Sequence, residues 1–112
     1  MGPRDVSGIW IATQSNGWST DFIITQNGGT LSGDATANHF GGGAQQLQGM
    51  EFDGTVTDTS FVCSVTWSNG SRGRYEGTFG LDERLTGVTF DVVDPNHSAT
   101  WVASRLFPPP AS

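Results

Sequence analysis

Eight short stretches in which apolar and polar residues alternate follow one another along this chain, separated by turns rich in Gly, Asn and Asp. Such alternation is typical of a β-strand with one buried face. Eight strands with short connections favour an all-β, antiparallel up-and-down (meander) barrel, because closure leaves no exposed sheet edge. The expected strands cover residues 8–14, 21–26, 30–37, 50–57, 60–67, 73–79, 84–92 and 98–107.

Length and composition indicate one small domain. The chain has 112 residues, which is enough for a single modest core. We expect one β-barrel domain in residues 1–107 and an extended tail in residues 108–112, because three consecutive prolines cannot pair as a strand. The beginning of the chain has no apolar leader, which fits a cytoplasmic protein. A mature secreted form fits as well, so the compartment stays open.

Charge and motif content exclude several functions. The net charge is −6, and the chain has five arginines and no lysine, so it lacks the basic stripe that nucleic-acid binding requires. No apolar run approaches the roughly 20 residues that cross a bilayer, and we expect no membrane partner. The sequence shows no metal-ligand spacing, and the absence of lysine excludes Schiff-base and P-loop chemistry. We therefore expect no metal and no cofactor.

The period of two sorts the strand residues onto two faces. The predicted inward face is apolar and mixed in size, and the outward face is rich in Thr, Ser, Asp and Glu. Small residues at Ala12, Gly33, Ala35 and Ala37 predict open volume at one end of the barrel. The predicted inward residues are Trp10, Ala12, Phe22, Ile24, Leu31, Gly33, Ala35, Ala37, Phe52, Gly54, Val56, Phe61, Cys63, Val65, Trp67, Tyr75, Gly77, Phe79, Val88, Phe90, Val92, Ala99, Trp101 and Ala103. The predicted outward residues include Asp34, Asp53, Thr55, Ser64, Thr66, Arg74, Glu76, Thr78, Thr89 and Asp91.

Two features lie outside this pattern. Residues 38–48 form the one long connection and contain three consecutive glycines, which predicts either a lid over the barrel mouth or a plain connector. The apolar side chains of Ile9, Ile11, Ile23 and Val62 fall on the outward face. A contiguous patch of this kind predicts association with a second copy of the chain, that is, a homo-oligomer.

Several of the expected strands resemble those of the avidin and streptavidin family of eight-stranded barrels. Residues 7–10 are similar to the Gly-x-Trp of that family's first strand, residues 19–33 to its second and third, residues 52–69 to its fourth and fifth, and residues 71–77 to its sixth. Lipocalin-type barrels share part of the pattern. The resemblance implies a ligand pocket with Trp67 as an aromatic wall and Tyr75 where the family places a pocket Trp. It also implies that residues 38–48 correspond to the flexible loop over the biotin tail.

Departures from the family pattern bear on the ligand. The family's first-strand Asn corresponds to Ala12, and its third-strand Tyr and Ser correspond to Ala35 and Ala37. The nearest counterpart of the seventh-strand Trp is Phe90, and no equivalent of the final Asp stands near Arg105. A site without these hydrogen-bonding partners loses most of its specific recognition, which argues against biotin itself and leaves an apolar guest.

These observations favour a binding protein over an enzyme. We expect a small apolar or aromatic ligand in a mostly apolar, aromatic-lined cavity. The predicted ligand-binding residues are Trp10, Ala12, Phe22, Ala35, Asn38, His39, Phe40, Trp67, Tyr75, Phe90 and Trp101. One alternative is a cyclase or isomerase that confines an apolar substrate and uses Tyr75 and His39 as proton donor and acceptor. Another is a sugar-binding module that uses Trp18 and the Asn, Gln and Ser turns.

Overall fold

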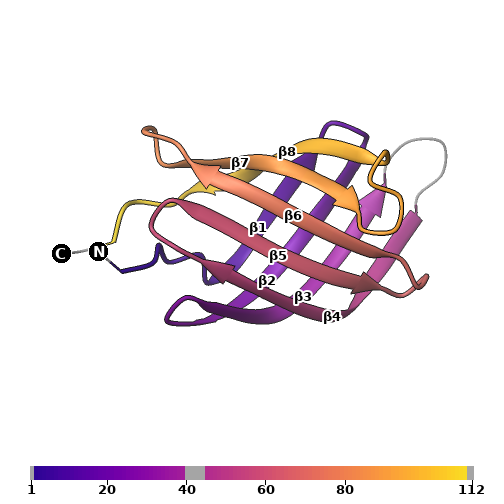
Figure 1. The fold of residues 1–112 in the computed structure, drawn as a ribbon, viewed down its shortest axis with the longest axis horizontal. Coiled ribbons are helices and arrows are strands. Elements are labelled where there is room, and N and C mark those ends of the chain that lie inside the picture. Colours follow the sequence, from indigo (N-terminus) through magenta and orange to yellow (C-terminus); the bar gives the residue numbers. More distant parts are fainter. Residues whose placement is uncertain (1, 40–44, 111–112) are drawn as a thin grey trace.

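The chain folds into eight antiparallel strands that close into one barrel (Figure 1). The structure is a computed structural model, and it describes residues 2–39 and 45–110. Within these residues there is no helix, and the all-β fold class and meander order predicted from the alternation are confirmed. The strands are β1 (Gly8–Gln14), β2 (Trp18–Asn27), β3 (Thr30–His39), β4 (Gln45–Val56), β5 (Ser60–Trp67), β6 (Arg72–Phe79), β7 (Arg84–Asp91) and β8 (Ser98–Leu106).

The barrel closes where the first strand meets the last. Ala12 of β1 lies opposite Ala103 of β8, and Gln14 lies opposite Trp101. All the other pairings join strands that follow one another in sequence, so each hairpin turn also fixes the register of the two strands that it connects. Because closure pairs both terminal strands, neither presents the unpaired backbone edge that an open sheet exposes.

The interior at one end of the barrel is filled with aromatic side chains. The ring of Trp10 lies 5.0 Å from Phe22, 5.6 Å from Phe61, 5.3 Å from Phe107 and 6.3 Å from Trp101, centroid to centroid. Tilted and edge-on contacts at these distances are favourable aromatic pairings. We call these five residues, all of them buried, the aromatic plug.

The open volume predicted beside the four small residues is found beside one of them only. Ala12 and Ala35 are buried within the packed core. Gly33 is exposed, because the register between β3 and β4 shifts between Leu31 and Thr36. The φ angle of Gly33 is +145°, and a Cβ there would clash with the carbonyl oxygen of Ile23, so this position requires glycine. Only Ala37 of the four small residues borders a cavity.

The inward face of β7 is the opposite of the predicted one. Leu85 and Thr89 are buried, whereas Val88 and Val92 are exposed. The prediction selected the more apolar of the two alternating sets. In the structure the second half of β7 reaches the polar end of the barrel, where a threonine faces inward and the valines face solvent.

Both chain termini seal the plugged end. The guanidinium of Arg4 donates hydrogen bonds to the carbonyl oxygens of Asp58 at 2.8 Å and Phe107 at 2.7 Å, and it lies 4.8 Å above the ring of Phe79. The indole N–H of Trp10 donates to the carbonyl oxygen of Val6 at 3.0 Å. These contacts satisfy the polar groups of the plug while covering its rings.

The outer surface of β1 and β2 carries exposed isoleucines. Ile9 lies directly opposite Ile23, and Ile11 follows on the same face of β1. Val62, which the alternation also places outward, is half-buried on β5. Association of two copies through this face stays a prediction.

We predict that Phe107→Ala lowers the free energy of unfolding by about 3–5 kcal/mol, because Phe107 is fully buried against Trp10 and Phe79. Leu106→Ala, one residue earlier and 47 % exposed, is the matched control and should cost less than about 1 kcal/mol. Urea unfolding followed by tryptophan fluorescence measures both. Equal losses in the two variants would contradict the sealing role of Phe107.

Candidate functional site

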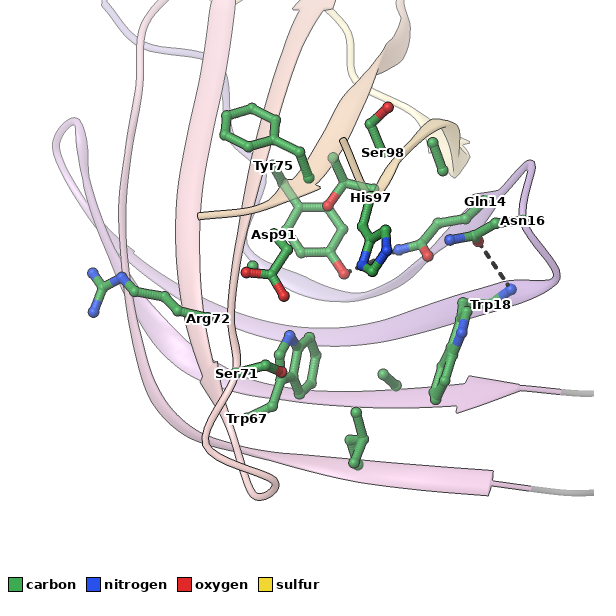
Figure 2. Close-up of a pocket in the computed structure, with 16 residues that line it drawn as sticks. Gln14, Asn16, Trp18, Trp67, Ser71, Arg72, Tyr75, Asp91, His97 and Ser98 are labelled. Carbon is green, nitrogen blue, oxygen red and sulfur yellow. Dashed lines mark hydrogen bonds between the residues drawn. The ribbon is translucent and has the colours of Figure 1, made fainter. Parts of the chain in front are cut away.

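A cavity of about 180 Å³ opens at the end of the barrel opposite the plug. We call it the mouth cup (Figure 2). It is lined by Gln14, Asn16, Trp18, Ala37, Leu47, Trp67, Ser71, Arg72, Gly73, Tyr75, Thr89, Phe90, Asp91, His97, Ser98 and Ala99. These residues come from all eight strands and from the loops that join them at this end, so the cup is a product of barrel closure.

Strand alternation places the large side chains of the cup. Trp67 is the last residue of β5 and alternates inward with Val65, and Tyr75 alternates inward on the neighbouring β6. A Cβ on Gly73 would lie 3.1 Å from Nε1 of Trp67, so the absence of a side chain at this position makes room for the indole. Among the described residues, the Trp67 N–H donates to no protein acceptor. Trp67 thus forms a wall with one free polar atom.

The floor of the cup is a buried hydrogen-bonded cluster. The Tyr75 hydroxyl lies 2.7 Å from the hydroxyl of Thr20, and the side-chain amide of Gln14 donates to Tyr75 at 3.0 Å. The same amide lies 3.4 Å from the Thr20 hydroxyl. The Tyr75 ring packs edge-on against Phe22 and Trp101 at 5.3 and 6.0 Å, which fixes its position on the plug. The floor is therefore rigid and polar at one point.

Burial sets the protonation state of this floor. Desolvation raises the pKa of Tyr75, although the hydrogen bonds from Thr20 and Gln14 act in the opposite direction. At neutral pH the hydroxyl is protonated and neutral. Burial also raises the pKa of the Cys63 thiol, which makes this cysteine a core residue and a poor nucleophile.

Charged groups lie at the rim of the cup. Asp91 is half-buried, and its Oδ1 accepts two backbone N–H groups of the following turn at 2.8 and 3.3 Å. Alternation predicts Asp91 on the outward face; this is wrong, because β7 has the opposite phase and ends at the mouth. Arg72 pairs with Asp53 at 3.9 Å, and Nε2 of His97 lies 3.6 Å from the carboxylate of Asp94.

The predicted ligand-binding residues separate into three groups, of which the third is Asn38, His39 and Phe40 in the long connection. Trp67, Tyr75 and Phe90 line the cup. Phe90 is half-buried, although β7 has the opposite phase to the one predicted. Five others lie in the packed core beneath the cup and do not line it: Trp10, Ala12, Phe22, Ala35 and Trp101. A molecule in the cup would therefore not touch these five side chains.

The long connection is shorter than predicted. Of residues 38–48, Asn38 pairs with Gln46 and His39 pairs with Gln45 as parts of β3 and β4, so a loop with these limits is wrong. Asn38 bonds to Asp21 on the outer face at 3.3 Å, and the ring of His39 lies 4.9 Å from Trp18. Phe40 and the three glycines lie outside the described residues. His39 does not line the cup, so it is not brought to Tyr75.

Sequence reasoning missed several residues that line the cup or its floor. Thr89 and Asp91 were assigned to the wrong face of β7, and starting the alternation at Leu85 would have found both. Thr20 lies before the expected second strand, which starts three residues earlier than predicted at Trp18. His97 lies in the turn between β7 and β8, and Ser98 is the first residue of β8 and falls on its outward phase, so strand alternation selects neither residue.

Fold and site together define a small up-and-down β-barrel with a cup at one end, the architecture that also hosts single small ligands in other barrels. Comparisons of this chain with known protein families, with curated proteins and with solved structures find no match. In the described part of the chain, no group of three or more His, Cys, Asp or Glu side chains is arranged to hold a metal ion. Nor does any helix there have the length and apolar character to cross a membrane.

We predict that Tyr75 ionises at higher pH in the folded barrel than in the unfolded chain. It is the single tyrosine of the chain, so ultraviolet tyrosinate absorbance reports on it alone. Because folding raises the pKa of Tyr75, the protonated hydroxyl stabilises the folded state. This stabilisation is complete below the unfolded pKa of about 10, and it is lost as the pH rises above that value. Absorbance should appear near pH 10 in urea-unfolded protein and at clearly higher pH in folded protein. Coincident titration curves would show that the hydroxyl is solvated.

Proposed function

We propose that this protein binds one small ring compound in the mouth cup and catalyses no reaction on it. The observation that carries the proposal is the pairing of aromatic walls with a buried polar floor in one cavity of about 180 Å³. Drug-sized ligands occupy pockets of roughly 300–1,000 Å³, so a single ring with a few substituents suits this cup. Part of such a guest would remain in contact with solvent.

The chemistry of the walls supports a ring as the guest. Trp18, Trp67, Tyr75 and Phe90 offer flat apolar surfaces, against which another ring gains both burial and aromatic contact. The N–H of Trp67, which has no acceptor among the described residues, and the side-chain oxygen of Gln14 are groups that a guest can satisfy. A guest that covers these groups without pairing with them binds weakly, so they give the cup selectivity.

The resemblance to the avidin and streptavidin barrels supports the general proposal and argues against biotin. Trp67, the aromatic wall implied by that resemblance, lines the cup. Ala12 and Ala35, which stand where the family has an Asn and a Tyr, are buried in the packed core below it. They offer a guest neither a hydrogen bond nor a surface.

The two alternatives receive less support from the geometry. An enzyme that uses Tyr75 and His39 requires both groups at one substrate, and His39 packs against Trp18 at the edge of β3 instead. The sugar-binding alternative keeps Trp18, Asn16 and Gln14, which do line the cup. Simple sugars therefore belong in the set of compounds to be tested.

We predict that a panel of small ring compounds and monosaccharides contains members that shift the NMR signals of the cup and leave those of the plug unchanged. The four tryptophans report separately in ¹H–¹⁵N spectra, because Trp18 and Trp67 line the cup whereas Trp10 and Trp101 lie in the plug. A bound guest should shift the indole N–H resonances of Trp18 and Trp67. A panel in which no compound shifts either resonance would overturn the proposal.

A matched pair of variants tests the location of binding. Ala99 lines the cup, and its neighbour Thr100 faces solvent on the same strand. Ala99→Leu fills the cavity and should weaken binding by at least about tenfold, the effect of losing roughly 1.4 kcal/mol. Thr100→Leu adds the same side chain outside and should leave the affinity unchanged. Equal effects would place the guest elsewhere.

A further inference from the structure

The charged groups that face the inside of the mouth cup are of one sign. Two charged side chains that line it, Asp91 and Arg72, differ in where their charged groups point. Asp91 lies opposite Gly73, the position that faces the Trp67 indole, whereas in Figure 2 the Arg72 guanidinium extends away from the other labelled side chains. Arg72 is held there by Asp53 at 3.9 Å and by the hydroxyl of Thr66 at 3.4 Å, both outside the cup. The charge that a guest meets is therefore negative.

Asp91 is oriented by its own turn. The backbone N–H groups of Val93 and Asp94 both donate to Oδ1, at 2.8 and 3.3 Å. Among the described residues, Oδ2 accepts no hydrogen bond and takes part in no ion pair. His97, which also lines the cup, lies 3.6 Å from Asp94 and so has a partner apart from Asp91. One carboxylate oxygen of Asp91 is thus left for a guest.

The aromatic walls favour the same sign of charge. The faces of Trp and Tyr rings carry partial negative charge and attract cations within about 6 Å, most strongly where water is excluded. Trp18, Trp67 and Tyr75 all line the cup beside Asp91. The Gln14 amide donates to Tyr75 and Thr20 through Nε2, which leaves its oxygen as a further acceptor for an N–H donor.

We infer that the guest of the mouth cup is a small organic cation, an amine or ammonium group carried on or beside one ring. This inference rests on the proposed function, because it names the chemical class of the ligand for that same site. The cationic group pairs with Oδ2 of Asp91 and the carbonyl oxygen of Gln14, while the ring lies against Trp67. The net charge of −6 acts in the same direction by attracting cations to the protein.

Three probes of equal size test the sign of the charge. At neutral pH, 2-phenylethylamine is a cation, 2-phenylethanol is neutral and phenylacetate is an anion, and all three carry the same ring on a short chain. We expect the amine to bind about tenfold more tightly than the alcohol, the combined size of one cation–π contact and one partly exposed ion pair. The acid should bind more weakly than both. Added salt should reduce the preference for the amine.

Asp91→Asn removes the charge and keeps the oxygen that accepts the two backbone N–H groups, so the turn is preserved. This variant should lose the preference for the amine and retain the affinity for the alcohol. Asp34→Asn on the exposed surface of β3 changes the net charge by the same amount and is the control. It should bind all three probes as the parent chain does.

The outcomes separate the two proposals. Equal affinities for the three probes, tighter binding of the acid, or an unchanged preference in Asp91→Asn would overturn the cation inference and leave a binding cup. An amine that shifts neither Trp18 nor Trp67 would also overturn it. The panel of ring compounds then decides the proposed function independently, because that panel includes neutral and anionic members.

Discussion

Closure of the sheet between β1 and β8 is the constraint on which the rest of the structure depends. The contact is short and places two small residues, Ala12 and Ala103, directly opposite each other. Small side chains there let the strands curl around Trp10 and Trp101, whose rings lie 6.3 Å apart and nearly parallel. An open sheet would expose both strand edges and remove one wall from the aromatic plug. The same closure brings the loop of His97 beside Gln14 at the mouth.

The two ends of the barrel differ in their packing, and the less densely packed end holds the mouth cup. Large rings fill one end, so the hydrophobic gain of folding is concentrated there. The cup begins where the side chains become smaller and more polar, at Ala37, Thr89 and Ala99. Within the described residues, no buried side-chain nitrogen or oxygen lacks a hydrogen-bond partner. The Tyr75 cluster therefore forms a floor that is already in place without a ligand, and under the proposed function this lowers the entropic cost of binding.

Much of the fold could be predicted from the sequence, because strand alternation and turn residues are local signals. The eight strands, the closed meander and the inward position of Trp67 follow from period two alone. β7 shows the limit of this reasoning. Alternation shows which residues of a strand share a face. The decision about which face points inward then assumes that the barrel interior is apolar along its whole length. At the mouth the interior is partly polar, so Thr89 and Asp91 face inward although the assumption of an apolar interior predicts the valines there.

Strand alternation predicts residues of the cup where a strand carries them inward, as it does for Tyr75 and Trp67. Asn16 is a candidate only through the polar turns of the sugar-binding alternative, and His97 reaches the site from a turn that alternation does not describe. His39 illustrates the reverse error. It has the chemistry of a catalytic residue, but its ring lies against Trp18 and outside the cavity.

The hydrogen bond between Arg4 and the carbonyl oxygen of Phe107 has a practical consequence for handling the molecule. It holds the two ends of the barrel domain next to each other on the face turned away from the cup (Figure 1). A tag, a fluorophore or an immobilising surface attached at either end would leave the mouth cup unobstructed. The short gap also suits circular permutation, in which a brief linker joins the old ends and a hairpin elsewhere is opened.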